Sequence, residues 1–241
     1  MYKIAAVDLD GTMLNKYGSV TDETKSAIKQ TIEKGTDVII ASGRPIDSIK
    51  TIAEEIGSNN YFIAGNGSLI YDIKNDKIMY EKFLNKQKVL EIAEICEENS
   101  ISYNIYTEET IIAKQLKHNV LYYYKENLKK EEKNKTSITL VENIIDYIKS
   151  SDNNKFLKIT ICDETKSIFN SVLRKLGTVS DIDILDVSHM SRKTIRQGTE
   201  DVDIEYFYTE ISINGADKWT AIEYLINFLN IEKEEVIAIR W

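Results

Sequence analysis

The N-terminal third of the chain alternates between short apolar runs and longer stretches with apolar residues at helical spacing. The apolar runs, rich in β-branched residues, are Lys3–Leu9, Asp37–Ala41 and Tyr61–Ala64. Such runs are typical of parallel strands that are buried on both faces. The stretches between them, Thr21–Lys34 and Ser48–Ile56, are each followed by a glycine that can end a helix. The order strand, helix, strand, helix, strand predicts a parallel α/β sheet.

The pattern changes after the third strand. Leu69–Tyr71 and Ile78–Tyr80 flank the polar stretch Asp72–Lys77, which predicts a hairpin. Further helices and strands follow. The expected helices are Asn85–Asn99, Glu142–Ser150 and Glu164–Leu176, and the expected strands are Ile101–Tyr106, Phe156–Cys162, Ile182–Val187 and Tyr206–Ser212. We expect the strands Ile101–Tyr106 and Phe156–Cys162 to be half-exposed.

The N-terminal pattern resumes near the end of the chain, with a helix over Lys218–Leu229 and a buried strand over Val236–Ile239. The simplest fold class is therefore α/β, with a Rossmann-like parallel sheet core and an inserted α/β domain. We place the core at residues 1–84 and 212–241 and the inserted domain at residues 85–211. Within that domain, the charge-rich run Lys125–Lys135 is expected to be a solvated loop or a helix end.

Charge and composition exclude several classes of function. The chain has 31 Lys and Arg against 39 Asp and Glu, a net charge of −8, which disfavours a nucleic-acid partner. We expect no membrane association, since no apolar run approaches the roughly 20 residues of a membrane span. Without a signal peptide, we expect a cytoplasmic protein whose two cysteines, Cys96 and Cys162, are reduced. Only His118 and His189 could supply imidazole, so any metal should be a hard cation held by oxygens.

The first strand ends in Asp8-Leu9-Asp10-Gly11-Thr12. Open α/β sheets bind their ligands at the carboxyl ends of strands, and two carboxylates two residues apart would point the same way in a strand. An Asp in this position can attack phosphorus and form an aspartyl-phosphate. The second Asp can protonate the leaving oxygen and then deprotonate water. The backbone amides of Leu9, Gly11 and Thr12 can bind phosphate, because the glycine permits a sharp turn. The alternative is an Asx-turn, which is common for a lone Asp.

Two further strands end in candidate binding residues. Ser42 and Gly43 precede a helix, where a hydroxyl and helix N-terminal amides can bind a phosphate oxygen. Arg44 follows as a candidate substrate-binding residue, although a Ser-Gly pair is also common in ordinary loops. Asn66 is a second substrate-binding candidate, and its Gly-Asn-Gly-Ser stretch is equally compatible with a turn that uses left-handed glycines.

Lys218 opens the helix that follows the inserted domain. The helix macrodipole disfavours a cation at this end, so its presence suggests a nearby cluster of anions and a role in phosphate binding. The residues alone leave an ordinary surface lysine as the alternative.

Together, the stretches DLDGT, ASGRP, GNG and Lys-x-Thr-Ala resemble the haloacid dehalogenase superfamily. The similarity extends to its Cof-like branch, whose capped members are phosphatases of sugar phosphates and related small metabolites. The resemblance implies a Mg²⁺-dependent phosphatase acting on a small phosphorylated metabolite, with the inserted domain as its cap. It also implies that Asp8 is the nucleophile and a metal ligand, and that Asp10 is the general acid/base and binds the metal through its carbonyl. In the same comparison, Ser42 binds the phosphoryl group and Lys218 neutralises its charge.

The sequence departs from the family in two places. Family members have Gly-Asp after the strand corresponding to Val236–Ile239, and this Asp completes the magnesium site, whereas Arg240 and Trp241 stand here. We therefore expect a C-terminally incomplete core, weak magnesium binding and impaired activity. Trp219, where the family usually has Gly, is expected to be a tolerated residue on a helix face. The alternatives are a non-catalytic truncated homologue or phosphometabolite-binding protein, in which Asp217 is a candidate replacement acid, and a phosphomutase or phosphotransferase.

Overall fold

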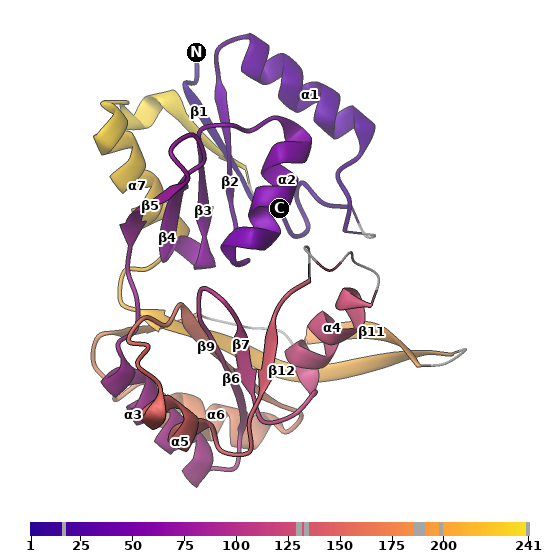
Figure 1. The fold of residues 1–241 in the computed structure, drawn as a ribbon, viewed down its shortest axis with the longest axis vertical. Helices are drawn as coiled ribbons and strands as arrows, with labels where there is room; N and C mark the ends of the chain where they lie inside the picture. Colours follow the sequence, from indigo (N-terminus) through magenta and orange to yellow (C-terminus); the bar gives the residue numbers. More distant parts are fainter. Residues whose placement is uncertain (16–17, 129–131, 133–134, 186–190, 198–199, 240–241) are drawn as a thin grey trace. The chain divides into compact units, whose positions relative to one another are not determined.

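A computed structural model describes residues 1–15, 18–128, 132, 135–185, 191–197 and 200–239 of the chain (Figure 1). The chain divides into two compact units. The core unit consists of Met1–Lys82 and Ala216–Trp241, and the inserted unit consists of Phe83–Gly215. Arg240, Trp241 and part of the expected strand Ile182–Val187 lie outside the described residues, as does much of the charge-rich run.

The core unit contains a six-stranded sheet in the order β13-β1-β2-β3-β4-β5. The strands are β13 (Val236–Ile239), β1 (Ile4–Val7), β2 (Asp37–Ala41), β3 (Tyr61–Ala64), β4 (Leu69–Asp72) and β5 (Lys77–Glu81). The first four are parallel, and the last two form an antiparallel hairpin on β3. The predicted parallel sheet and the predicted hairpin are both confirmed.

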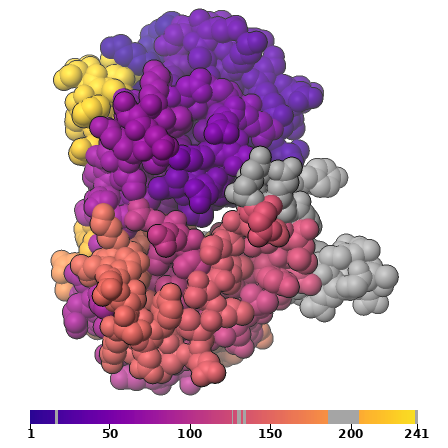
Figure 2. Space-filling view, in the orientation of Figure 1, coloured from indigo at the N-terminus to yellow at the C-terminus, as the bar shows by residue number. Residues whose placement is uncertain are grey.

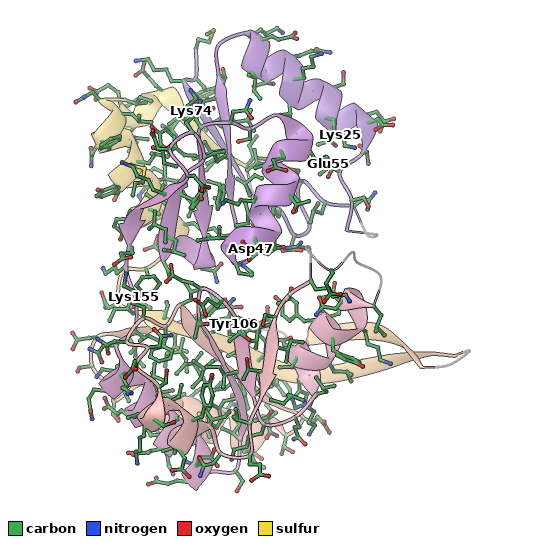
Figure 3. All side chains as sticks on the ribbon, viewed as in Figure 1. Lys25, Asp47, Glu55, Lys74, Tyr106 and Lys155 are labelled. Atoms are coloured by element: carbon green, nitrogen blue, oxygen red, sulfur yellow. The ribbon has the colours of Figure 1, made fainter. Side chains whose placement is uncertain are left out.

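Helices cover both faces of this sheet. In Figure 1, α1 (Asp22–Glu33) and α2 (Ile46–Ile56) lie on one face and α7 (Lys218–Leu229) lies on the other. The buried face of α7, which includes Leu225, packs on residues such as Ile39 and Ile63 of the central strands. On the opposite side, an ion pair of 2.7 Å joins Lys25 of α1 to Glu55 of α2 (Figure 3). The strands β1, β2 and β3 are therefore buried, as their continuous apolar runs predict. The prediction that Val236–Ile239 is also a buried strand is wrong, because β13 lies at the edge of the sheet and Ile239 is exposed.

The inserted unit contains a second sheet, in the order β10-β12-β9-β6-β7-β8, with β11 paired to β12. Its strands are β6 (Ser102–Tyr106), β7 (Ile111–Ala113), β8 (Ile138–Leu140), β9 (Lys158–Asp163), β10 (Ile182–Ile184), β11 (Ser191–Gln197) and β12 (Glu200–Ile213). The helices α3 (Lys86–Glu98), α5 (Ile144–Ser150) and α6 (Lys166–Leu176) pack on one face. The predicted α/β insertion is confirmed, whereas β7, β8, β11 and α4 (His118–Asn127) were not predicted.

Both faces of β6 and β9 are buried, so the expectation that these strands are half-exposed is wrong. Side chains of α4 cover the second face, where the ring centroids of Tyr123 and Tyr106 lie 6.5 Å apart. An ion pair of 2.7 Å between Lys158 and Glu210 lies on the same face, and the Lys158 side chain is only 7% exposed. The polar residues of these strands therefore mark a buried polar layer and not a solvent-facing surface.

Side chains fill the spaces between the ribbons of each unit, as the space-filling view shows (Figure 2). Cys96 and Cys162 are both buried and free, in agreement with the prediction of reduced thiols. Among the described residues, every helix is too short or too polar to cross a membrane.

Candidate active site

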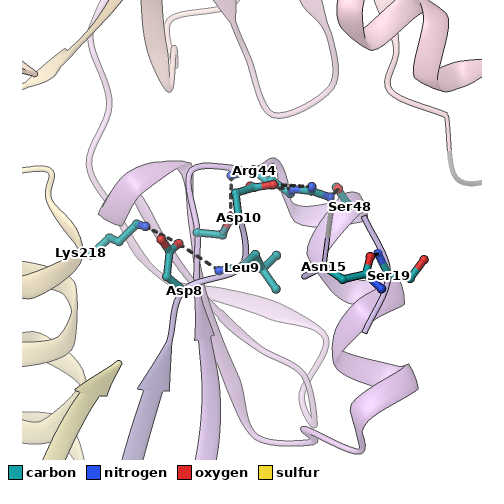
Figure 4. Close-up of polar contacts among 9 residues, drawn as sticks. Asp8, Leu9, Asp10, Asn15, Ser19, Arg44, Ser48 and Lys218 are labelled. Atoms are coloured by element: carbon teal, nitrogen blue, oxygen red, sulfur yellow. Dashed lines mark hydrogen bonds and ion pairs between the residues drawn. The ribbon is translucent and has the colours of Figure 1, made fainter. Parts of the chain in front are cut away.

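Asp8 follows β1 directly and lies where the strand meets its neighbours. Its backbone amide donates to the carbonyl of Ile239 in β13 at 3.0 Å. Its carboxylate Oδ1 accepts hydrogen bonds from Leu9 N at 3.0 Å and from Lys218 Nζ at 2.7 Å (Figure 4). The Asp8 side chain is 15% exposed, so this carboxylate is partly desolvated and yet remains reachable from solvent. Two donors therefore fix one oxygen of a carboxylate at the carboxyl end of a buried strand.

The chain leaves the strand at Val7, and the following residues form a compact turn. The amides of Met13 and Leu14 donate to the carbonyls of Asp8 and Leu9 at 3.2 Å and 2.9 Å. The side chain of Leu9 is fully buried and anchors this turn. Asp8 and Asp10 both lie beyond the end of β1, so this turn, and not the alternation of side chains along a strand, places their carboxylates.

Gly11 completes the turn with a left-handed φ of +79°, and no atom lies within 4 Å of the position that a Cβ would occupy. The turn therefore needs glycine for its backbone conformation and not for space. The amide of Thr12 donates to the Leu9 carbonyl at 3.3 Å, and the Leu9 amide is bound to Asp8. Two of the three amides predicted to bind phosphate thus already have acceptors inside this segment.

Arg44 binds Asp10 through two hydrogen bonds, a pairing that was not predicted from the sequence. Its Nε donates to Asp10 Oδ2 at 3.1 Å and its Nη2 donates to Oδ1 at 2.7 Å, while Nη1 lies 3.5 Å from Ser48 Oγ (Figure 4). The Arg44 side chain is 24% exposed and the Asp10 side chain is 65% exposed. A bidentate guanidinium restricts both the position and the orientation of a carboxylate. Arg44 thus orients Asp10 in this structure.

Ser42, Gly43 and Asn66 come together beside this pair. Ser42 is buried, and its Oγ accepts a hydrogen bond from the Arg44 amide at 3.2 Å. The Asn66 amide donates to the Ser42 carbonyl at 3.0 Å, and Asn66 has a left-handed φ of 58°. A Cβ on Gly43 would lie 2.5 Å from Asn66 Oδ1, so any other residue here would require the Asn66 side chain to move. The ends of β2 and β3 therefore bring three of the predicted site residues into one cluster.

Lys218 is the first residue of α7 and pairs with Asp8, so the alternative of an unpaired surface lysine is wrong. Asp217 is the N-cap of the same helix. Its Oδ1 accepts from Trp219 N at 2.8 Å and Thr220 N at 3.0 Å, and its Oδ2 accepts from Thr220 Oγ1 at 2.6 Å. Burial would raise the pKa of Asp217, but these hydrogen bonds lower it below its ordinary value. Asp217 thus serves as the cap of α7, with both of its carboxylate oxygens accepting hydrogen bonds from the first turn.

Trp219 lies along the face of α7, as expected. Its Nε1 donates to Glu223 Oε1 at 2.7 Å, one turn further along the helix. The Lys233 amine lies 4.6 Å from the centre of its rings, in cation–π range. The side chain also packs against the apolar core beneath α7. It therefore covers apolar surface beneath the helix.

The charges of the site alternate, with Lys218 beside Asp8 and Arg44 beside Asp10. Within the part of the chain that the structure describes, no group of three or more His, Cys, Asp or Glu residues could hold a metal ion. The Asp8 carboxylate and the Asp10 carbonyl are nevertheless hard oxygen ligands. Mg²⁺ commonly binds one or two carboxylates together with substrate phosphates and water. The available oxygens therefore suit a magnesium ion that binds with a phosphate, and do not suit an ion held by protein ligands alone.

Comparison with known proteins assigns the chain to a class. A family model of haloacid dehalogenase-like hydrolases matches residues 5–239. The chain therefore belongs to this family of hydrolases, and the resemblance drawn from its motifs is confirmed.

Three individual matches illustrate the relationship. "Putative phosphatase YxeH" of Bacillus subtilis (strain 168) is 25% identical over 243 residues, covering 99% of this chain and 80% of the relative. "5-amino-6-(5-phospho-D-ribitylamino)uracil phosphatase YcsE" of the same organism is 33% identical over 87 residues, covering 36% of this chain and 34% of the relative. The solved structure of a haloacid dehalogenase-like hydrolase from B. subtilis has a TM-score of 0.76 at 20% identity, covering 99% of this chain and 82% of that one. This structural likeness shows the fold, and the predicted α/β core with an inserted α/β domain is confirmed.

Proposed function

We propose that this hydrolase is a phosphatase that cleaves monoesters of small phosphorylated metabolites, such as sugar phosphates. The observation that carries the proposal is the 2.7 Å contact between Asp8 Oδ1 and Lys218 Nζ at the carboxyl end of β1. A carboxylate nucleophile and a phosphate repel each other, and a lysine placed between them offsets that repulsion. The phosphatase names of the relatives support the same class of substrate.

The reaction is proposed to proceed in two steps on Asp8. Its Oδ1 is held by Leu9 N and Lys218, and among the described residues no hydrogen bond reaches Oδ2, which is therefore the attacking oxygen. Attack on phosphorus forms an aspartyl-phosphate and breaks the ester bond, while Asp10 gives a proton to the leaving oxygen. Water then attacks the phosphorus, Asp10 takes the proton from that water, and the Asp8 carboxylate and inorganic phosphate are released.

The remaining candidates are assigned to binding. Those proposed to bind the phosphoryl oxygens are Leu9, Gly11, Thr12, Ser42, Gly43 and Lys218. The amides of Leu9 and Thr12 would exchange their present acceptors, Asp8 Oδ1 and the Leu9 carbonyl, for phosphoryl oxygens. Arg44 and Asn66 are proposed to bind the rest of the substrate. Arg44 also orients Asp10, because its guanidinium binds both carboxylate oxygens, and one of these oxygens leaves the guanidinium when Asp10 carries the proton that it donates.

Magnesium is proposed as the cofactor, with Asp8 and the Asp10 carbonyl as its protein ligands. When bound, such an ion offsets the charge that develops on the phosphoryl oxygens. We propose that its affinity is weak without substrate, because the Asp8 carboxylate is already paired with Lys218 and the Asp10 carbonyl is the one other protein ligand proposed. Isothermal titration with magnesium, alone and with vanadate as the phosphate mimic, tests this point. Binding of equal strength in both titrations would contradict it.

The function is tested by turnover of p-nitrophenyl phosphate with and without magnesium, followed by a panel of sugar phosphates. Asp8→Asn should abolish turnover, and the control Asp22→Asn, at a fully exposed site in the first turn of α1, should not. Activity that survives Asp8→Asn would refute the assignment. A phosphometabolite-binding protein would instead bind vanadate without turning over any ester. A phosphotransferase or phosphomutase, given a hexose phosphate, would pass the phosphoryl group to a sugar hydroxyl and release a phosphorylated product in place of inorganic phosphate.

A further inference from the structure

Gly67 is the point at which the loop after β3 meets the first peptide of α7. Its φ is +105°, and a Cβ built on it would lie 2.1 Å from the carbonyl oxygen of Asp217 and 2.8 Å from the amide nitrogen of Lys218. Both are backbone atoms, so no flexible side chain can move aside. Glycine at this position therefore lets the Asp217–Lys218 peptide lie directly against the loop.

The same loop is fixed on its other side to the end of β2. The amide of Gly65 donates to the carbonyl of Arg44 at 3.1 Å, and the amide of Asn66 donates to the carbonyl of Ser42 at 3.0 Å. The Asn66 side chain lies against Gly43, where an added Cβ would meet it at 2.5 Å. The loop is thus a spacer between the Ser42–Arg44 segment and the start of α7.

The start of α7 is itself well ordered by hydrogen bonds. The Asp217 carbonyl that faces Gly67 accepts from Ala221 N at 3.1 Å, and the Asp217 side chain caps the first turn. Lys218 follows immediately, and its Nζ lies 2.7 Å from Asp8 Oδ1. A shift of the Asp217–Lys218 peptide therefore moves the base of the side chain that reaches Asp8.

We propose that Gly67 is a positioning residue, which sets the reach of the Lys218 amine toward Asp8 by allowing α7 to start against the loop. The inference rests on the proposed function, because it is there that Lys218 offsets the charge of nucleophile and phosphate. In Gly67→Ala, the loop and the Asp217–Lys218 peptide must separate until the 2.1 Å contact lengthens to at least 3.0 Å. Misplacement of a catalytic group by about 1 Å can lower the rate about 100-fold, and we expect a loss of this size in kcat.

A double-mutant cycle tests whether Gly67 acts through Lys218. Gly67→Ala should lower kcat about 100-fold in the natural background. In a Lys218→Met background, in single-turnover assays, it should lower the rate by less than about twofold, because the group it positions is absent. Gly57→Ala is the matched control, since Gly57 is also left-handed, at φ +74°, but no atom lies within 4 Å of its Cβ position. An equal loss in both backgrounds would overturn the proposal, because it would mark a general structural defect.

A second measurement needs no catalysis. Competitive acetylation of the folded protein, followed by mass spectrometry, compares Lys218 with Lys50, whose amine is paired with Asp76 at 2.8 Å. The ratio of Lys218 to Lys50 labelling should rise severalfold in Gly67→Ala and stay unchanged in Gly57→Ala. An unchanged ratio in Gly67→Ala would overturn the proposal.

The two measurements separate this inference from the proposed function. If the natural chain turns over no phosphate ester, the proposed function fails and the labelling ratio alone decides the inference. If Gly67→Ala does not fold, Asn66→Gly replaces it, since glycine accepts the φ of 58° at that site and loosens the loop without adding bulk. A higher labelling ratio in that variant supports positioning by the loop, and an unchanged ratio contradicts it.

Discussion

Replacement of Lys218 by methionine separates a catalytic ion pair from one that stabilises the fold. The variant keeps the length and most of the packing of the side chain but removes its charge. The Lys218 and Asp8 side chains are 25% and 15% exposed, so their 2.7 Å contact is neither fully buried nor a simple surface pair. Loss of such a contact costs about 1 kcal/mol of unfolding free energy once solvent screening is included.

A second effect acts in the opposite direction. Lys218 is the first residue of α7, where a cation is unfavourable by about 0.3–1 kcal/mol. The two contributions nearly cancel, so the unfolding free energy should change by less than about 1 kcal/mol. Turnover should fall much further, by about 100-fold to 1000-fold, because removal of one preorganised electrostatic group from a reaction centre has an effect of that size.

The assay pairs urea unfolding with p-nitrophenyl phosphate turnover for Lys218→Met and for the control Lys50→Met. Lys50 forms an ion pair of similar length, 2.8 Å, with Asp76 in the same unit, and neither residue belongs to the candidate site. The control should lose at most about 1 kcal/mol of stability and keep its turnover. The reasoning would be refuted if Lys218→Met lost about 3 kcal/mol or more of stability, as for a broken buried pair, while turnover remained normal.

Three further predictions concern other described contacts. Arg44→Lys replaces the bidentate contact with Asp10 by a single hydrogen bond. Because the Asp10 side chain is 65% exposed, we expect only about a fivefold fall in kcat. An unchanged kcat would show that Arg44 does not orient the general acid. The pKa of His118 is below its ordinary 6.5, mainly because the side chain is buried and secondly because the cation Lys117 lies nearby. As the pH falls below about 6.5, the unfolded chain therefore takes up a proton before the folded chain does, and the inserted unit should lose stability. His118→Asn, which suits the φ of 48°, should flatten this dependence in urea unfolding at pH values on both sides of that point, and an unchanged slope would contradict the assignment. Lys158→Met should cost about 3 kcal/mol in urea unfolding because the Glu210 side chain, which is only 18% exposed, loses the cation paired with it, whereas a loss below about 1 kcal/mol would show that the pair is not structural.

Much of the core unit could be predicted from the sequence because its local signals agree with its tertiary structure. The strands β1, β2 and β3 are continuous apolar runs, and a helix between buried parallel strands needs only a cap and one apolar face. The cap of α1 follows this rule, since the Thr21 side chain accepts from Thr24 N at 3.2 Å. The candidate residues at the ends of these strands were then brought close together by the parallel topology.

The inserted unit was harder to predict because several of its elements lack such signals. The strands β7 and β8 have only 3 residues each, too few to show a period. Helix α4 begins at His118, whose φ of 48° is uncommon for a residue other than glycine, and its tyrosine-rich sequence has no clear apolar stripe. The polar face of β6 and β9 is buried because α4 covers it and because Glu210 pairs with Lys158. The alternation of polar and apolar residues within β6 or β9 indicates neither of these contacts.

The same reasoning explains which parts of the site were missed. The pairing of Arg44 with Asp10 joins residues that are 34 positions apart, and the sequence contains no signal that assigns one to the other. Asp217 is a candidate metal ligand by its position before Lys218, but an aspartate directly before a helix is also a strong N-cap, and this local signal could have identified the capping role that the structure shows. The need for glycine at position 67 arises from packing against a segment far along the chain.

The pairing of Asp8 with Lys218 determines when the site can assemble during synthesis of the chain. The two residues are 210 positions apart, and at about 5–20 residues per second a ribosome needs about 10–40 s to join them in one chain. During that interval β1 has β2 beside it but lacks β13, so one of its edges is still open to other chains. All strands of the inserted unit emerge before Lys218, so that unit can fold while the core is still waiting for its last helix. The nascent chain therefore carries its candidate nucleophile from the beginning of synthesis but cannot assemble a working site until α7 has left the ribosome.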